Sequence, residues 1–293
     1  MSARLLVNPG GGRGRTGRHL AELRRLAARH GLPVELSRDA ADLTARARRA
    51  AADGLERLLV AGGDGTLHHA LQGLTGTGCA LGIVPLGSGN DLAGALGVPA
   101  APAAAIAAGL ERPVSAIDLG RAGGRFFAGV AGVGFDSEVN RCANERVRWV
   151  RGPLVYVVAV LRTLWGFRPP RFRVRWDGGA FDGPAMFVAV ANAPRYGGGM
   201  RIAPAARLDD GRLDLVLVRA VSRLALLRVF PRVFRGSHVD HPAVLVARAG
   251  RVEIAVEPPL ELFADGEPAA PVGSEPLAIE IAPLALRVVA GRV

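Results

Sequence analysis

Three glycine-rich segments constrain the fold of this chain most strongly, because each directly follows a short apolar run and precedes a stretch with helical periodicity. They are NPGGGRGRTG at residues 8–17, GGDGT at residues 62–66 and PLGSGND at residues 85–91. A strand, a glycine loop and a helix in repeated succession indicate parallel strands connected by helices. The carboxyl ends of such strands share one edge of the sheet, so we expect the three loops to line a single crevice.

The first 120 residues carry this alternation throughout. In the segment at residues 18–31, one helical face carries Leu20, Leu23, Leu26 and Ala27. Asp39 is the expected N-cap of the next helix. These patterns predict an α/β domain at residues 1–120 with a mostly parallel sheet.

The pattern changes after Asp118. Strand-like runs such as RFRVRW, AMFVAVANA, RVEIAVE and LAIEIA dominate the rest of the chain, with turns at glycine and proline. Two helical insertions are expected, at about residues 136–167 and 222–235. We therefore predict a β-rich domain at residues 121–293, with the alternative that its last segment returns to the first domain.

The composition indicates a compact protein whose surface meets phosphate groups. Apolar residues make up 49% of the chain and charged residues 22%, which excludes a mostly disordered protein. The formal net charge is +11, and all 37 basic residues are arginines. Such a surface suits nucleotides, nucleic acids or anionic lipids, although genome base composition is an alternative explanation. Aromatic residues amount to only 5% and are not interleaved with basic ones, so nucleic acid is not an expected partner.

The expected location is the cytoplasm, either free or at the inner membrane face. Cys79 and Cys142 match no metal or redox spacing and are expected to be buried thiols. The N-terminus lacks the pattern of a signal peptide. The longest apolar run, at residues 152–167, is interrupted by Arg162 and falls short of the roughly 20 residues that a spanning helix needs.

Glycine loops before helices are typical of phosphate binding. Backbone N–H groups can approach phosphate oxygens where no Cβ intervenes, and the positive end of the following helix points to the same place. Residues 12–17 also match GxGxxG, with Glu35 and Asp39 near the spacing of a ribose-binding acid, so a dinucleotide site is an alternative. Ordinary strand-to-helix turns are a further alternative. The lysine-dependent phosphate loop is excluded because the chain contains no lysine.

The order of the motifs resembles that of the diacylglycerol kinase catalytic family, which includes soluble bacterial lipid kinases and sphingosine kinases. The resemblance rests on NPGGGRGR, GGDGT, GIVPLGSGNDLA, NAPRYGGGMRIAP, RLDDGRLDL and FADGEP, and covers nearly the whole chain. GGDGT alone is shared with NAD kinases, whereas the ordered set is specific. The resemblance implies an NAD kinase-like N-terminal domain and a β-rich C-terminal domain, with ATP and Mg²⁺ in the cleft between them.

The resemblance also implies a reaction. The γ-phosphoryl group of ATP would pass to a lipid hydroxyl, with diacylglycerol as the expected acceptor and phosphatidic acid as the product, a step of phospholipid biosynthesis. NAD kinase and a non-catalytic basic membrane-binding module of the same fold are the alternatives. The oligomeric state stays open, with a homodimer as one alternative.

Site residues follow from the same resemblance. Asp265 in FADGEP matches the general base, and Asp64 and Asp91 match the acidic network around the catalytic metal. The Asp265–Gly266 pair equally suits a hairpin turn. The positions that match the ATP-binding set, in which either Arg13 or Arg15 meets the phosphates, are Asn8, Gly10, Arg13, Arg15, Gly62, Gly63, Gly65, Thr66, Gly87, Ser88 and Asn90.

A structural Mg²⁺ is implied at RLDDGRLDL. The resemblance assigns it to Asp210 and the carbonyl of Leu213, with Glu267 nearby. A plain turn at residues 209–211 is the alternative.

Three stretches are candidates for contact with an anionic membrane. RFRVRW at residues 171–176 would present arginines on one strand face, residues 221–236 form a basic amphipathic segment that Pro231 interrupts, and residues 154–165 are apolar. Each stretch also has a plain structural interpretation, as a solvated strand face or as cover for a sheet. His238 and His241 are expected to be turn residues rather than a metal pair.

Overall fold

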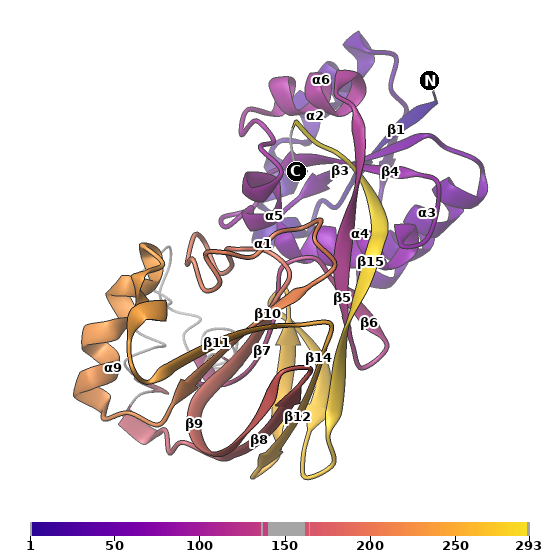
Figure 1. Ribbon diagram of the computed structural model, residues 1–293. Coiled ribbons are helices and arrows are strands. Elements are labelled where there is room, and N and C mark those ends of the chain that lie inside the picture. The colour runs from indigo at the N-terminus through magenta and orange to yellow at the C-terminus, as the bar shows by residue number, and fades with distance from the viewer. Residues whose placement is uncertain (1, 136, 140–161, 164, 292–293) are drawn as a thin grey trace.

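The computed structural model describes the chain except residues 1, 136, 140–161, 164 and 292–293. Cys142, most of the predicted insertion at residues 136–167 and most of the apolar stretch at residues 154–165 therefore lie outside the described residues. The expected fold class is confirmed, with an α/β N-terminal half and a β-rich C-terminal half (Figure 1). Within the described part, no helix is both long and apolar enough to cross a bilayer.

The N-terminal half contains a parallel sheet in the order β4-β3-β1-β2. Its strands are β1 (Ala3–Val7), β2 (Val34–Leu36), β3 (Arg57–Gly62) and β4 (Ala80–Pro85). The helices are α1 (Gly11–Arg18), α2 (Leu20–Arg29), α3 (Ala40–Ala52), α4 (Asp64–Leu74), α5 (Asp91–Ala95) and α6 (Pro102–Glu111).

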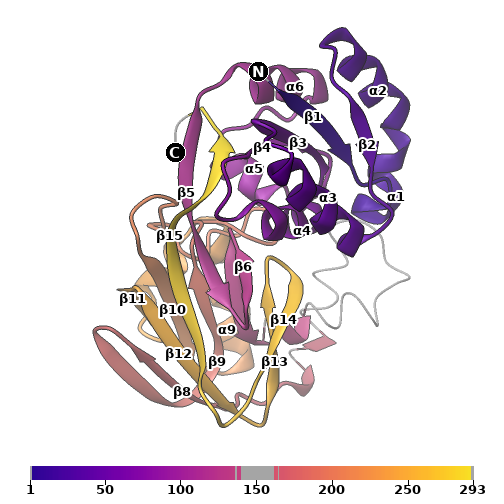
Figure 2. The same cartoon turned by 90° about the vertical axis from the view of Figure 1, so that its right-hand side faces the viewer.

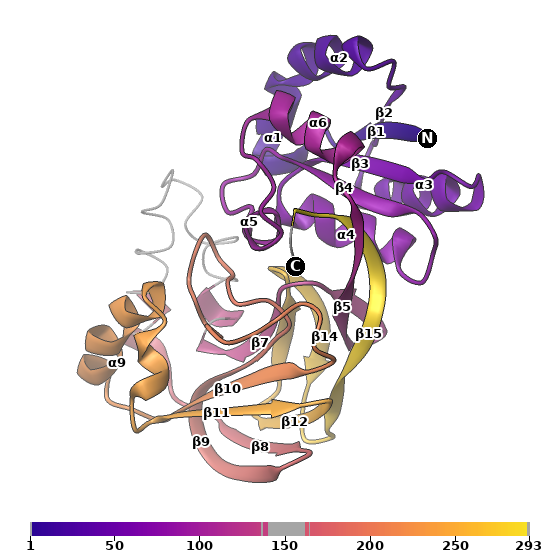
Figure 3. The ribbon, with the colours of Figure 1, turned by 45° about the horizontal axis from the view of Figure 1, so that its top comes forward.

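Helices cover both faces of this sheet, as Figure 3 shows. Successive strand residues point to opposite faces, so Leu5 packs with α2 and α6 while Leu6 packs with α3 and α4. The expected apolar face of α2 is confirmed, because Leu23, Leu26 and Ala27 are buried. Asp39 caps α3, with its carboxylate accepting a hydrogen bond from the Asp42 N–H at 2.8 Å.

The first glycine segment was expected to be a loop through residue 17, and this expectation is wrong. Helix α1 already begins at Gly11, so the loop after β1 is confined to residues 8–10. Gly17 donates its N–H to the Pro9 carbonyl at 3.1 Å, and a Cβ at Gly17 would lie only 3.0 Å from that oxygen. Gly17 therefore allows helix α1 to pack closely against Pro9, in the segment that precedes the helix.

The C-terminal half is built mainly from antiparallel strands. These are β5 (Val114–Ala122), β6 (Arg125–Phe127), β7 (Val130–Gly134), β8 (Arg171–Trp176), β9 (Gly179–Ala191), β10 (Leu213–Arg219), β11 (Val244–Ala249), β12 (Arg251–Glu257), β13 (Leu260–Ala264), β14 (Glu267–Val272) and β15 (Leu277–Val289). Between β10 and β11 lie helix α9 (Arg223–Val229) and the 3-10 helices η1 (Phe230–Phe234) and η2 (Ser237–Asp240). Pro231 stands in the first turn of η1, where the α-helix ends.

Two long strands connect the halves. β15 pairs antiparallel with β12 and β5, and near its end Val288 pairs parallel with Leu81 of β4. Figure 2 shows β5 and β15 running side by side from one half into the other. The last strand thus extends the N-terminal sheet, and residue 120 lies inside β5 rather than in a linker.

Buried Asp118 in β5 fixes this connection. Its carboxylate accepts hydrogen bonds from the backbone N–H groups of Gly211 and Leu284, each at 2.7 Å. Leu284 has a φ of 48° and lies where the register of β15 against β5 shifts. Asp118 therefore ties the bend in β15 and the loop before β10 to one strand.

Gly120 allows the ring of Phe127 to lie flat on β5. The two residues face each other across β5 and β6, and a Cβ at Gly120 would lie 2.0 Å from the Phe127 Cζ atom. Phe127 is fully buried and cannot move aside. We expect Gly120→Ala to lower the free energy of unfolding by about 1–3 kcal/mol through overpacking.

Urea unfolding would measure this change. Gly78→Ala is the matched control, because a Cβ at Gly78 would meet no atom within 4 Å. Equal midpoints for the two variants would contradict the packing argument.

Candidate active site

The loops after β3 and β4 touch each other at the carboxyl edge of the sheet. A Cβ at Gly63 would lie 2.9 Å from the Gly87 Cα, and a Cβ at Gly87 would lie 2.6 Å from the Gly63 Cα. Neither position has room for a side chain. The glycines at these two positions therefore permit the contact that brings Asp64 and Asp91 together.

Asp64 connects the two loops. Its carboxylate oxygens accept hydrogen bonds from the backbone N–H groups of Asn90 at 2.8 Å and Asp91 at 2.9 Å. Asn90 has a φ of 55°, and its side-chain oxygen accepts a hydrogen bond from the Gly87 N–H at 2.8 Å. Burial raises the pKa of Asp64, and the neighbouring Asp91 charge raises it further.

Asp91 joins the N-terminal loops to the C-terminal half. Its carboxylate accepts hydrogen bonds at 2.9 Å from the N–H groups of Gly198 and Gly199, which lie between β9 and β10. A Cβ at Gly89 would lie 2.7 Å from an Asp64 oxygen and 3.2 Å from an Asp91 oxygen, so both carboxylates lie beside this glycine. Backbone N–H groups from both halves of the chain therefore hold the acidic pair, Asp64 and Asp91, in place.

Asp265 lies in a two-residue turn between β13 and β14. Asp265 has a φ of 53° and Gly266 a φ of 84°, the backbone of a hairpin turn of type I′. The carboxylate accepts hydrogen bonds from the backbone N–H groups of Ala128, Gly129 and Val130, at 3.0, 2.8 and 3.2 Å. The residue thus has the turn geometry and also carries a carboxylate that these amides hold in place, and its charge helps to raise the pKa of Asp64.

His68 joins Asp265 to helix α4, and sequence analysis assigned it no role. Its Nδ1 atom lies 3.3 Å from a carboxylate oxygen of Asp265, and its side chain is fully buried. Its Nε2 atom is buried without a hydrogen-bond partner among the described residues. The position one helical turn after Asp64 was the only sequence signal, since residues i and i+4 share a helix face.

Small polar side chains gather beneath the first glycine loop. The Asn8 amide donates to the Thr66 hydroxyl at 3.3 Å, and a Cβ at Gly11 would lie 3.0 Å from the hydroxyls of both Thr16 and Thr66. A Cβ at Gly62 would lie only 2.4 Å from the Thr66 oxygen. The loops after β1 and β3 therefore adjoin.

The remaining predicted phosphate residues have varied surroundings. Gly10 is the N-cap of α1, whereas Ser88 and Arg15 are exposed. The side chain of Arg13 lies outside the described part of the structure. A Cβ at Gly65 would lie 2.7 Å from the Glu267 Oε1 atom, so Glu267 reaches the first turn of α4.

The residues assigned to a structural metal make separate contacts. Asp210 pairs with Arg248 and accepts a hydrogen bond from the Arg212 N–H at 3.1 Å, whereas Glu267 approaches Gly65. The Leu213 side chain is buried in the core at the start of β10. Within the described ranges, no group of three or more His, Cys, Asp or Glu residues is arranged to hold a metal ion.

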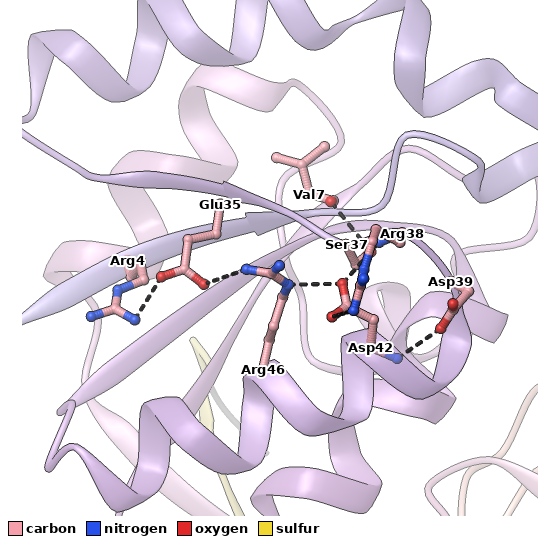
Figure 4. Close-up of polar contacts among 8 residues, drawn as sticks. All are labelled: Arg4, Val7, Glu35, Ser37, Arg38, Asp39, Asp42 and Arg46. Atoms are coloured by element: carbon pink, nitrogen blue, oxygen red, sulfur yellow. Dashed lines mark hydrogen bonds and ion pairs between the residues drawn. The ribbon is translucent and has the colours of Figure 1, made fainter.

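The acids of the alternative dinucleotide site have structural contacts instead. Glu35 pairs with Arg4 at 2.7 Å and with Arg46 at 3.4 Å (Figure 4). Asp39 caps α3, and the whole GxGxxG stretch at residues 12–17 lies inside helix α1 rather than in a loop before it. These contacts favour the phosphate-binding interpretation that uses all three loops.

An apolar cavity lies in the C-terminal half beside the Gly197–Gly199 turn. Residues Tyr196 and Met200 line it and exchange backbone hydrogen bonds at 3.0 Å, which closes the turn whose amides bind Asp91. His238 also lines the cavity, with its Nε2 atom 3.0 Å from the Ile202 carbonyl oxygen. Since a carbonyl only accepts, Nε2 carries the proton, and burial lowers the pKa of this imidazole.

Family models match both halves of the chain. The diacylglycerol kinase catalytic domain matches residues 2–122, and the YegS C-terminal NAD kinase beta sandwich-like domain matches residues 129–290. The motif set that carries the resemblance in the sequence thus lies within matched regions.

Individual proteins agree with these models. A diacylglycerol kinase of Mycobacterium tuberculosis is 39% identical over 87% of this chain and 83% of the relative. A diacylglycerol kinase of Bacillus subtilis is 30% identical over 90% of this chain and 89% of the relative. A crystal structure of a diacylglycerol kinase from Bacillus anthracis has a TM-score of 0.73 and 21% identity over 99% of this chain and 97% of that one, which shows the shared fold.

The family models cover nearly the whole chain, and the relatives match it over most of their own length. The acidic pair, the fixed Asp265 carboxylate and the glycine loops lie within the same matched regions. This chain belongs to the diacylglycerol kinase family and is an ATP-dependent lipid kinase.

Proposed function

We propose that this kinase transfers the γ-phosphoryl group of ATP to the free hydroxyl of diacylglycerol and produces phosphatidic acid. The observation that carries the proposal is the convergence of Asp64, Asp91 and Asp265 at the edge of the sheet where the glycine loops end. Phosphoryl transfer needs positioned phosphates, charge neutralisation and a base for the acceptor proton. The three carboxylates and the open loop backbone supply groups suited to each need.

The triphosphate would lie along the glycine loops. Backbone N–H groups near Gly10, Gly63 and Gly87, together with the first turn of α4, can donate to phosphate oxygens. Glycine has no Cβ to keep a phosphate away from these N–H groups, and at Gly63 and Gly87 it also allows the two loops to touch. Arg15 is exposed at the end of α1, where a guanidinium can neutralise phosphate charge.

The acidic pair fits one Mg²⁺ ion. Mg²⁺ keeps several waters and is usually bound by one or two carboxylates plus substrate phosphates, so a complete protein cage is not required. Carboxylate oxygens of Asp64 and Asp91 both lie beside Gly89, and burial together with the Asp91 charge raises the pKa of Asp64, an effect that a bound cation would offset. When bound, the ion would neutralise the charge that develops on the transferred group.

Asp265 is the proposed general base. It would accept the proton of the acceptor hydroxyl while the hydroxyl oxygen bonds to the γ-phosphorus and the bond to the departing ADP oxygen breaks. Three backbone N–H groups donate to its carboxylate and hold the side chain in one rotamer. His68 acts as a positioning residue through its contact with one Asp265 oxygen.

The apolar cavity is the proposed place for an acyl chain of the acceptor. The turn at Gly198 and Gly199 forms its edge through Tyr196 and Met200 and also binds Asp91. A lipid lying in the cavity would therefore place its polar end beside the acidic pair. The same arrangement disfavours NAD phosphorylation, because a dinucleotide ribose offers no apolar chain for this space.

Replacing the proposed base should slow transfer strongly while preserving the fold. We expect Asp265→Asn to lower kcat by about 10²- to 10⁴-fold, because the amide cannot accept the hydroxyl proton. The measurement follows radiolabel from the terminal phosphate of ATP into lipid-extractable product, in detergent micelles that contain diacylglycerol and Mg²⁺.

Asp53→Asn serves as the control, since Asp53 is exposed at the end of α3. Label in another lipid alcohol would change the acceptor and keep the mechanism. Phosphorylation of NAD without labelled lipid would reject the proposal.

Protons should compete with Mg²⁺ at the acidic pair. A carboxylate must be deprotonated to bind metal, and the pKa of Asp64 lies above its ordinary value of 3.8. Activity at low Mg²⁺ should therefore fall as the pH falls through this raised pKa, and higher Mg²⁺ should move the acid limb to lower pH. The check is a set of pH–rate profiles at several Mg²⁺ concentrations. If the pH of the acid limb is the same at every Mg²⁺ concentration, the result would argue against metal binding at Asp64.

A further inference from the structure

Helix α9 and η1 form an element with two different faces. The inner face packs on the C-terminal half, where Leu226 and Val233 are buried and line the apolar cavity together with Val229 and Phe230. The outer face leaves large apolar side chains in solvent, with exposed fractions of 57% for Leu224, 40% for Leu227 and 51% for Phe234. Figure 1 shows α9 at the outer edge of this half, away from β5 and β15.

Arginines surround the exposed apolar residues. We use the term docking face for the exposed arginines and large apolar residues of this element and its C-cap, Arg223, Leu224, Leu227, Arg228, Arg232, Phe234 and Arg235. The sequence contains no Asp or Glu from residue 219 to residue 239. Among the described residues, no ion pair connects an arginine of the docking face to a carboxylate. The face therefore carries positive charge that the rest of the described structure does not neutralise.

The other basic stretch proposed from the sequence differs in this respect. On β8, Arg171 pairs with Asp182 at 2.8 Å and Arg173 pairs with Glu257 at 3.3 Å. The alternation predicted for this strand is present, because Phe172 and Val174 are buried beneath exposed arginines. Part of its charge is thus matched within the fold, and the exposed residues of β8 itself are all arginines.

Trp165 adds an aromatic group beside the docking face. Its side chain is 81% exposed, and the Arg223 guanidinium carbon lies 5.9 Å from the centre of its ring. Elements that lie in the interface of a bilayer combine arginines on a polar side with Trp, Phe and Leu on an apolar side. The composition of the docking face matches this requirement.

We infer that the docking face binds an anionic lipid bilayer and places the kinase with its apolar cavity over the membrane surface. The exposed Leu and Phe side chains enter the boundary between headgroups and acyl chains, while the arginines meet lipid phosphates. The inner face of the same element lines the cavity, so an acceptor lipid would travel only past α9 and η1 to reach it. This last step rests on the proposed function, whereas binding to the bilayer does not.

Vesicle sedimentation with the full chain tests the inference. The vesicles consist of phosphatidylcholine with and without phosphatidylserine. Each arginine near an anionic surface contributes about fivefold to binding, so the combined Arg228→Gln, Arg232→Gln and Arg235→Gln variant should bind the phosphatidylserine vesicles about 100-fold more weakly. The matched control is Arg171→Gln, Arg173→Gln and Arg175→Gln on β8, which changes the net charge equally and should bind nearly as well as the wild type.

A second variant tests whether the exposed Leu and Phe side chains enter the bilayer. Leu224→Ser, Leu227→Ser and Phe234→Ser together should weaken binding even at high salt, where the attraction between arginines and lipids is screened. Circular dichroism confirms that each variant is folded. Equal losses for the two arginine variants, or unchanged binding of the serine variant, would overturn the inference. A wild-type dimer that the serine variant dissociates would assign the face to a second copy and would also overturn it.

Kinase activity in detergent micelles separates this inference from the proposed function. Both arginine variants should keep wild-type label transfer to micellar diacylglycerol, since their residues lie outside the acidic site. If the wild type labels no lipid while vesicle binding follows the expected pattern, the proposed function fails and the docking face stands. If micellar lipid is labelled but both arginine variants bind vesicles alike, the docking face fails and the function stands.

Discussion

Carboxylates that accept hydrogen bonds from backbone amides hold the loops and strands of the two halves of this kinase in place. Asp64 joins the loops after β3 and β4, and Asp91 joins the second of these loops to the C-terminal half. Asp118 ties β5 to the bend of β15, and Asp265 is fixed by amides that precede and begin β7. Hydrogen bonds with an ionised acceptor are stronger than neutral ones, so these four residues set the geometry of the site.

This construction makes the site dependent on both halves. The amides that hold Asp91 come from the turn that also borders the apolar cavity. His68 and Asp265 are 197 residues apart and still contact each other, because β13 and β7 place the hairpin turn beside α4. A lipid kinase must exclude water from a reacting hydroxyl while holding a polar triphosphate nearby. Loops from an α/β half and a cavity in a β-rich half provide these two environments side by side.

Charge is distributed unevenly over the same fold. Arginines on β8 are matched by Asp182 and Glu257, and Arg46 on α3 is matched by Asp42 and Glu35. The arginines of α9 and η1 have no such carboxylates among the described residues and alternate with exposed apolar side chains. A net charge of +11 alone does not reveal this difference, because matched and unmatched arginines contribute equally to it.

Local sequence patterns were enough to predict the alternation of strands and helices and the glycine loops after β3 and β4, and the ordered motifs were enough to predict the family. The spacing of apolar residues predicted the buried face of α2, and the order of the short motifs predicted the lipid kinase family. It did not determine that residues 11–18 form a helix, because a glycine-rich stretch has weak local preferences and Gly17 fits α1 only through its contact with Pro9.

Tertiary structure alone decided which side chains share the site. Asp118 has no distinctive neighbours in sequence, and His68 has only its place one helical turn after Asp64; their roles arise from partners that lie 93 and 197 residues away. The same limit applies to the arginines, since only packing shows which carboxylates reach them. The spacing of residues along one element predicts which of its surfaces is apolar. Contacts between distant segments depend instead on how β5 and β15 join the sheets of the two halves.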